Sequence, residues 1–466
     1  MSGTYAHFVG IGGAGMSGIA RVLHDRGVGV TGSDMKMSRY ASALADAGVP
    51  VFVGHDAANL GDPEVVVVSS AIRPDNPEVV EALRRGIPVW QRAKMLAALA
   101  GDRRTVAVAG THGKTTTSSL AATTFIAMGL DPTFLVGGEV RDAGSNARCG
   151  SGDLYVVEAD ESDGSFLCLD PFVAVVTNVE ADHLDHYSGI EEVVATFREF
   201  VARVHADGAL VLCADDARAM SLASSCPARV VTYGLSDEAE VRCFGLQLRG
   251  IGHDFRVALP DGRVVACSIA SPGVHNVVNA TAVLACAFVL GNDVEAAAAG
   301  IADFGGVKRR FETVADADGV WIVDDYAHHP TEVKATLAAA RIAAQGRLWV
   351  LFQPHRYSRT AALAREFGEA FDDADRVVLM DVYSAGETPV PGVSGKTIVD
   401  AVLAHDPRVS LAYFPHRTDI GGYLATRLRP GDLIMTMGAG DVTAMGPEIV
   451  RALGEHAGGG GAPACP

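Results

Sequence analysis

The chain has 466 residues, of which 48% are hydrophobic and 20% charged, and its formal net charge is −18. This length exceeds what one hydrophobic core supports, so we expect several domains of ordinary globular composition. The acidic balance argues against a nucleic-acid partner, because binding a phosphate backbone requires clustered lysines and arginines. A secretory signal and apolar runs near the ~20 residues of a membrane helix are both missing, which predicts a cytoplasmic protein without membrane insertion.

A glycine-rich stretch, HFVGIGGAGMSGIA, opens the chain at His7 and is followed by a second apolar run that ends at Asp34. A glycine pattern of this spacing after a strand and before a helix is typical of a dinucleotide-binding βαβ unit. It predicts either a nicotinamide-dependent dehydrogenase or a protein that binds some other diphosphate. The glycines expected to let the backbone approach a pyrophosphate are Gly10, Gly12, Gly13 and Gly15.

Short apolar strands alternate with helical patterns, which predicts an α/β protein of three domains. Residues 1–101 are expected to form a Rossmann-like domain with a parallel, doubly wound sheet. Residues 102–311 are expected to form a P-loop ATPase-like domain with a mixed sheet, and residues 312–454 a second Rossmann-like domain. The glycine- and proline-rich end, 455–466, is predicted to be disordered.

The stretch GTHGKTTT is the strongest chemical signal, because it stands between a predicted strand and a predicted helix. Lys114 is expected to reach the β- and γ-phosphates of ATP, and the Thr115 hydroxyl to ligate Mg²⁺. Val108 stands where the first glycine of the G-x4-GK[ST] pattern would fall, so this is a variant loop. The residues of this loop predicted to contact ATP are Gly110, Thr111, His112, Gly113, Lys114, Thr115 and Thr116.

Acids and histidines follow two later strands, in EADES and VEADHLDHY. Glu158 and His183 are predicted Mg²⁺ ligands, direct or through water, because an ion on ATP needs only one or two protein groups. The DHLDH segment also suggests zinc, but Mg²⁺ with ATP accounts for the same acids better, since no closing cysteine stands nearby. His186 is expected to belong to a polar loop.

From His7 to about Asp441 the chain resembles the Mur ligases of bacterial peptidoglycan synthesis, and most of all their L-alanine-adding branch. The resemblance implies a UDP-sugar domain, a central ATPase domain and a C-terminal domain that closes over the site. It implies ATP and Mg²⁺ as cofactors, and UDP-N-acetylmuramate and L-alanine as substrates. The segments that carry it are HFVGIGGAGMSGIA, SSAIRPDNPE, GTHGKTTT, EADESDGSF, HNVVNA, RRFE, DDYAHHPTE and FQPHRYSRT.

The same resemblance implies contacts to the nucleotide. His275, Asn276 and Asn279 are expected to contact the adenine, Asp325 the ribose, and Arg310 the phosphates. The pyrophosphate held by the first glycine loop then belongs to the UDP-sugar.

Contacts to the other substrate groups are implied as well. Ser70 is expected to contact the UDP-sugar, and Asp34 its nucleotide or sugar end. His328 is a candidate general base by residue type alone. The residues expected to line the amino acid and the muramyl carboxylate are Tyr326, His328, His355 and Arg356.

These groups suit the phosphorylation of a carboxylate to an acyl phosphate, followed by attack of an amine. The residues expected to act in that chemistry are Lys114, His183, Arg310, His328, His355 and Arg356. Some members of the family hold a second Mg²⁺ with a carbamylated lysine in the central domain. This chain has no lysine between Lys114 and Lys308, which excludes that device in this block.

Three alternatives stay open at this point. A dehydrogenase would bind NADH and has no use for Lys114 and Thr115. A recycling ligase of the same family would join a ready-made tripeptide, rather than L-alanine, to the same sugar nucleotide. A catalytically silent nucleotide sensor would be expected to carry damage at Lys114, Glu158 or His183, and these residues are present.

Overall fold

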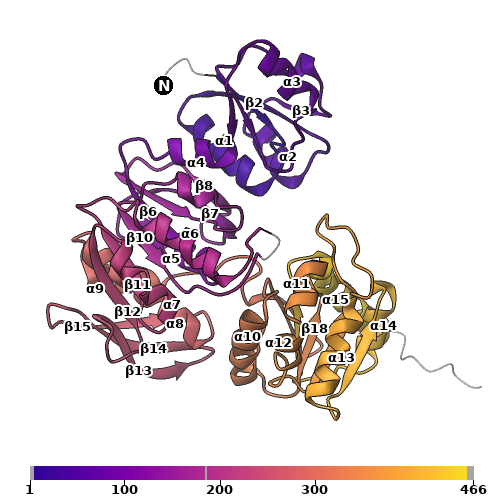
Figure 1. Ribbon diagram of the computed structural model, residues 1–466. Coiled ribbons are helices and arrows are strands. Elements are labelled where there is room, and N and C mark those ends of the chain that lie inside the picture. The colour runs from indigo at the N-terminus through magenta and orange to yellow at the C-terminus, as the bar shows by residue number, and fades with distance from the viewer. Residues whose placement is uncertain (1–4, 184–185, 459–466) are drawn as a thin grey trace, which may run out of the picture.

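The computed structural model describes residues 5–183 and 186–458. Each of the three parts of the chain contains its own sheet, and Figure 1 shows them as separate bodies coloured indigo, magenta and orange to yellow. The sheets have five, ten and six strands. The chain is therefore an α/β protein of three domains.

The N-terminal sheet is parallel throughout, in the order β3-β2-β1-β4-β5. Its β4 strand consists of four buried valines, because helices cover both faces of a parallel sheet. The short strand β3 was not expected from the sequence. The strands are β1 (Tyr5–Val9), β2 (Gly29–Asp34), β3 (Val51–Val53), β4 (Val65–Val68) and β5 (Val89–Gln91), and the helices are α1 (Ala14–Asp25), α2 (Arg39–Asp46), α3 (Pro77–Arg84) and α4 (Arg92–Ala98).

The central sheet is mixed, in the order β15-β14-β13-β12-β11-β10-β6-β9-β7-β8. β13, β14 and β15 form an antiparallel meander, and the strands from β12 to β7 in this order are parallel. Its strands are β6 (Arg104–Ala109), β7 (Thr133–Val140), β8 (Ser145–Arg148), β9 (Leu154–Glu158), β10 (Val173–Val176), β11 (Ala209–Cys213), β12 (Arg229–Gly234), β13 (Val241–Arg249), β14 (Gly252–Ala258) and β15 (Val264–Ile269).

Helices α5, α8 and α9 pack against one another in the central domain. Small side chains allow α5 to pack closely against α8 and α9. Its buried hydroxyls are partly satisfied within the helix, as where Thr123 Oγ1 donates to the carbonyl of Ser119 (3.0 Å). The helices of the domain are α5 (Lys114–Ala127), α6 (Ile190–Val201), α7 (Ala217–Met220), α8 (Val274–Val289) and α9 (Val294–Ala302).

The C-terminal sheet has the order β16-β17-β21-β18-β19-β20, with β16 antiparallel and apolar clusters on both faces. Its strands are β16 (Glu312–Ala317), β17 (Val320–Asp325), β18 (Leu348–Phe352), β19 (Arg376–Met380), β20 (Leu411–Phe414) and β21 (Leu433–Met437). Its helices are α10 (Pro330–Ala343), α11 (Tyr357–Ala362), α12 (Ala364–Gly368), α13 (Gly395–His405), α14 (Ile420–Ala425) and α15 (Met445–Gly458).

Helix α15 corrects the expected boundary of the C-terminal tail. The helix continues to Gly458, whereas disorder was expected from residue 455. The run of glycines starts only at Gly458, so the preceding Glu455, His456 and Ala457 extend the helix. Residues 459–466 lie outside the described residues. Among the described residues, the structure contains no helix with the length and apolar character needed to cross a bilayer.

Candidate active site

The phosphate loop lies between β6 and the first turn of α5. Gly110 adopts a φ of +130°, and a Cβ there would stand 2.0 Å from Thr177 Oγ1, so glycine is required. Lys114 Nζ donates to the carbonyls of Gly110 (2.7 Å) and Thr111 (3.1 Å) and to Glu161 Oε1 (2.8 Å). The lysine therefore folds over the loop, at a helix N-terminus suited to phosphate.

Oxygen ligands for a cation meet beside this loop. Thr115 Oγ1 donates to Glu158 Oε1 (3.1 Å), and the backbone of Gly137 donates to Glu158 Oε2 (2.7 Å). Burial raises the pKa of Glu158, and a divalent cation nearby would favour its charged form. His183 Nε2 lies 3.9 Å from Glu161 Oε1, and Glu161 Oε2 lacks a hydrogen-bond partner among the described residues. Hydroxyl and carboxylate oxygens of this kind fit Mg²⁺.

A cavity of about 340 Å³ adjoins the loop between the central and C-terminal domains. Asn279 Nδ2 donates to Asn276 Oδ1 (3.2 Å), while burial and the nearby Arg310 lower the pKa of His275 to about 4. Burial raises the pKa of Asp325 to about 6. The cavity wall includes the sequence-predicted nucleotide residues His112, Gly113, Thr116, His275, Asn276, Asn279, Arg310 and Asp325.

A second cavity, of about 560 Å³, joins all three domains. Ala14, Arg39 and Tyr40 contribute the N-terminal domain to its wall. This cavity is large enough for the reacting ends of several substrates, and it contains both cationic and carboxylate groups. The sequence-predicted residues on its wall are Thr111, Gly113, Lys114, Thr115, Glu158, His183, Arg310, Tyr326, His328, His355 and Arg356.

Two histidines of this second cavity are neutral at physiological pH. Burial lowers the pKa of His328 to about 3, and burial together with Arg359 lowers that of His355 to about 4. His328 Nδ1 donates to the carbonyl of Tyr326 (3.0 Å), which fixes the tautomer with Nε2 as the acceptor. His328 is thus free to accept a proton, although so low a pKa makes it a weak base. Its role as general base stays a prediction.

Several residues of the site were missed by the sequence analysis. Asp160 and Glu161 stand inside the quoted EADES segment, next to the predicted ligand, so a signal for them existed. Asp182 accepts hydrogen bonds from Arg359 Nε (3.1 Å) and Nη2 (2.8 and 3.0 Å), joining the central to the C-terminal domain. The two partners are 177 residues apart, and no local pattern connects them.

The end of β2 makes hydrogen bonds to the first glycine loop. The backbone of Gly12 donates to Asp34 Oδ2 (2.9 Å), and Ser38 Oγ donates to the carbonyl of Gly12 (2.8 Å). Gly10 has a φ of +84°. Asp34 therefore contacts the first glycine loop. The sequence indicates a contact from Asp34 to the UDP-sugar and gives no sign of this one. Ser70 lies exposed in the turn after β4.

Gly13 and Gly15 stand at the start of α1. Gly13 is the N-cap residue of α1 and makes no side-chain cap, so the first amides of the helix are left for a ligand. Gly15 and the neighbouring Ala14 line a cleft of about 170 Å³ against the central domain. Asn146 Nδ2 of that domain donates to the carbonyl of Ala14 (3.1 Å), so the helix start lies near the metal-ligand side of the site.

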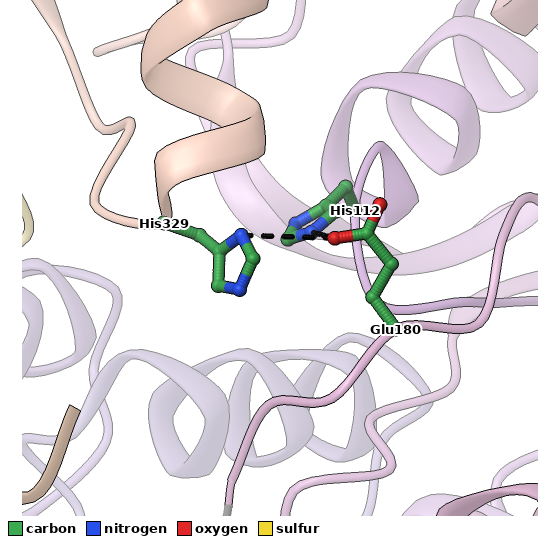
Figure 2. Close-up of side chains that lie close together, drawn as sticks. All are labelled: His112, Glu180 and His329. Carbon is green, nitrogen blue, oxygen red and sulfur yellow. Dashed lines mark hydrogen bonds and ion pairs between the residues drawn. The ribbon is translucent and has the colours of Figure 1, made fainter. Parts of the chain in front are cut away.

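A cluster of charged groups joins the phosphate loop to the C-terminal domain (Figure 2). His112 Nε2 lies 3.3 Å from Glu180 Oε2, and His112 Nδ1 lies 3.2 Å from Glu332 Oε1. His329 Nδ1 approaches Glu180 Oε2 at 3.8 Å, and Thr331 Oγ1 donates to the same oxygen (2.8 Å). The two domains are therefore linked beside the nucleotide cavity.

His112, Glu180 and His329 are close enough to be considered as metal ligands. However, both nitrogens of His112 face carboxylates. Burial on its own lowers the pKa of His112, but hydrogen bonds to Glu180 and Glu332 raise it to about 9. His329 Nδ1 accepts from the backbone of Thr331 (3.3 Å) as the cap of α10. Contacts of the protonated His112 ring with Glu180 and Glu332 are sufficient to account for its place in the cluster.

We expect His112 to make stability depend on pH. Because its folded pKa exceeds the unfolded value near 6.5, its contribution is full below that value and is lost as pH rises through about 9. Free energies of unfolding from pH 6 to 10 should show His112→Gln losing less stability with rising pH than the unsubstituted protein, by up to about 3 kcal/mol. Parallel curves for the two proteins would contradict the charge assigned to His112.

Three family models match consecutive parts of the chain. The Mur ligase family, catalytic domain, matches residues 5–104, the Mur ligase middle domain residues 108–287, and the Mur ligase, glutamate ligase domain, residues 309–440. Three α/β domains around an ATP loop define an ATP-dependent ligase, and the chain belongs to the Mur ligase family. This membership removes the dehydrogenase alternative raised by the first glycine loop.

Individual relatives match over nearly the whole chain. The UDP-N-acetylmuramate–L-alanine ligase of Rubrobacter xylanophilus is 51% identical over 449 residues, covering 96% of this chain and 99% of the relative. That of Pelotomaculum thermopropionicum is 46% identical, covering 97% and 98%. The crystal structure of UDP-N-acetylmuramate-alanine ligase from Thermotoga maritima superimposes with a TM-score of 0.79 at 28% identity, covering 97% and 99%.

A murein peptide ligase from Psychrobacter arcticus is also similar. Its crystal structure superimposes with a TM-score of 0.72 at 26% identity, covering 97% of this chain and 99% of that one. A murein peptide ligase therefore shares this fold, so the fold alone does not identify the substrate that is joined.

Proposed function

We propose that the protein joins L-alanine to the lactyl carboxylate of UDP-N-acetylmuramate, with hydrolysis of ATP to ADP and phosphate, in peptidoglycan precursor synthesis. The observation that carries the proposal is the 46–51% identity, over almost the full length, to ligases named for this reaction. Two neighbouring cavities support it, because they share Gly113 and Arg310 on their walls and the second reaches Ala14 at the start of α1. We place the reaction in the cytoplasm, where ATP is available.

The first step transfers the γ-phosphoryl group. A carboxylate oxygen of the sugar nucleotide attacks the γ-phosphorus, the bond to the bridging oxygen of ADP breaks, and an acyl phosphate forms. The amides at the start of α5 and the Lys114 ammonium stabilise the charge on the phosphate oxygens. Thr115, Glu158 and His183 would hold Mg²⁺, which supplies further positive charge to those oxygens.

The second step forms the amide. The amine of L-alanine attacks the acyl carbon, the tetrahedral oxyanion collapses, and phosphate leaves with the electron pair of the carbon–oxygen bond. Arg310 and Arg356 place cationic groups along the same cavity, where they can stabilise the oxyanion and the departing phosphate. The amine must lose a proton, and we assign His328 Nε2 as its acceptor, with the neutral ring as the supporting observation.

Phosphate release with ATP, Mg²⁺ and UDP-N-acetylmuramate tests the proposal. L-alanine, glycine, L-serine and an L-alanine-headed tripeptide are compared, and mass spectrometry identifies the product. We expect L-alanine to support turnover far better than the tripeptide. One methyl group changes binding by only ~1–3 kcal/mol, so glycine should react about 10- to 200-fold less efficiently. Faster turnover with the tripeptide would replace the proposal with the recycling activity.

A further inference from the structure

The catalytic steps above leave a buried carboxylate in the N-terminal domain without a role. Glu78, in the first turn of α3, is 0% exposed. Its Oε2 accepts a hydrogen bond from Ser33 Oγ (2.5 Å), and its Oε1 accepts from Asn59 Nδ2 (2.9 Å) and from the backbone of Asp56 (3.3 Å). Burying a charged carboxylate costs free energy, so the role of Glu78 is expected to lie in the neighbouring groups that it orients.

Two histidines complete the surroundings of this carboxylate. His7 Nε2 lies 3.6 Å and His55 Nδ1 3.5 Å from Glu78 Oε2, and Ser33 Oγ lies 2.9 Å from His55 Nδ1. Burial on its own raises the pKa of Glu78, but the neighbouring His7 ring and the hydrogen bonds from Ser33 and Asn59 lower it to about 2. Glu78 is therefore fully ionised, and it fixes the orientation of the Ser33 hydroxyl.

Ser33 connects this cluster to the first glycine loop. Its carbonyl oxygen accepts hydrogen bonds from the backbone of Gly10 (2.8 Å) and of Ile11 (3.0 Å). The next residue, Asp34, accepts from the backbone of Gly12. The end of β2 thus fixes three consecutive amides of the loop, and the hydrogen bond from Ser33 to Glu78 ties this end of β2 to α3.

The hydrogen bonds to β2 determine which backbone amides of the first glycine loop are available to a ligand. With Gly10, Ile11 and Gly12 committed to β2, the amides that follow, at the start of α1, are the ones directed to a ligand. A displacement of the end of β2 would be passed to these amides, because backbone hydrogen bonds tie the loop to this strand. Asn59 touches the same carboxylate through Oε1, on the side of Gly54 rather than of the loop.

We propose that Glu78 is a positioning residue which, through Ser33, sets the first glycine loop in the conformation that binds the pyrophosphate of the UDP-sugar. The inference rests on the proposed function, because it takes the UDP-sugar as the ligand of this loop. Glu78 acts at a distance and does not contact the substrate. Its effect is therefore on the affinity for one substrate, and the chemical steps are left intact.

The test compares Ser33→Ala and Glu78→Gln with Asn59→Ala, which removes a hydrogen bond from the same carboxylate away from the loop. Glu81→Gln, on the exposed face of α3, is the second control. We measure kcat, the KM of each substrate, the melting temperature, and UDP-N-acetylmuramate binding by calorimetry. Ser33→Ala and Glu78→Gln should raise the KM and Kd for the sugar nucleotide about 10- to 100-fold, with kcat and the KM of ATP within twofold.

The controls separate positioning from general stability. Asn59→Ala should lower the melting temperature while leaving the KM for the sugar nucleotide within twofold. If Ser33→Ala lowers the melting temperature but leaves that KM unchanged, the cluster is only structural and the inference is overturned. Ser33→Ala keeps the backbone and the carboxylate, so it provides the answer should Glu78→Gln fail to fold. If the unsubstituted protein itself does not bind UDP-N-acetylmuramate, the proposed function fails and the inference fails with it.

Discussion

Replacement of Lys114 by alanine should abolish ATP-dependent ligation while leaving the protein folded and able to bind UDP-N-acetylmuramate. Lys114 Nζ lies over the phosphate loop, where it supplies a fixed positive charge to the transferred phosphoryl group. Removing one such preorganised group typically lowers kcat by about 10²–10³-fold. The loop amides cannot replace it, because they are neutral donors directed at other oxygens.

The fold should tolerate Lys114→Ala because of Glu161, the carboxylate that pairs with this lysine. Burial raises the pKa of Glu161 to about 7 even with Lys114 beside it. Without the lysine, Glu161 takes up a proton instead of remaining as an unpaired buried charge. Lys334→Ala, which breaks a surface pair with Glu369, is the matched control. Phosphate release and calorimetry give the result, and substantial turnover by Lys114→Ala would remove this lysine from the mechanism.

The fold was predictable where the local sequence decides the structure. Both phosphate-binding loops require glycine at fixed positions, as the positive φ of Gly10 and Gly110 shows, so their spacing alone marks the start of two domains. The buried parallel strands read as continuous apolar runs. Strands β3, β8, β16 and β20 were missed, since most of their residues are half-buried or exposed and gain their strand form from pairing with a neighbour. Strand β7 was missed as well, although its first four residues are buried.

The site was predictable to the extent that its residues stand in short motifs. Lys114 and Glu158 share a cavity wall because they follow β6 and β9, neighbouring strands whose carboxyl ends meet at one edge of the central sheet. His328 follows β17 of the C-terminal sheet and reaches the same wall from the other domain. The pairing of His112 with Glu332, 220 residues later, depends on how the domains are placed, and no pattern in the sequence carries that information. The same holds for the buried contact of Ser33 with Glu78.

The ion pair between Asp182 and Arg359 should control the assembly of the active site. Both side chains are buried, at 9% and 8% exposure, and Arg359 comes from α11 of the C-terminal domain. Burial on its own raises the pKa of Asp182, but Arg359 holds it well below its usual range. Asp182 also precedes the predicted metal ligand His183, and Arg359 Nη1 lies 3.3 Å from His355 Nδ1. The pair therefore joins the two domains at the reacting groups.

Arg359→Met should lower kcat/KM by about 10²–10³-fold, because breaking a buried pair from one side costs ~3–5 kcal/mol and leaves Asp182 as an uncompensated charge between the domains. Asp182→Asn combined with Arg359→Met should recover part of this loss, since the double variant has no unpaired charge to bury. Arg341→Met, which breaks a partly exposed pair with Asp375 in the same domain, should change the rate less than threefold. Steady-state kinetics of the unsubstituted protein, the single variants Asp182→Asn and Arg359→Met, and the double variant complete the cycle, with Arg341→Met measured beside them as the control. Equal rates for the Arg359→Met single variant and the unsubstituted protein would show that the domains assemble without this ion pair.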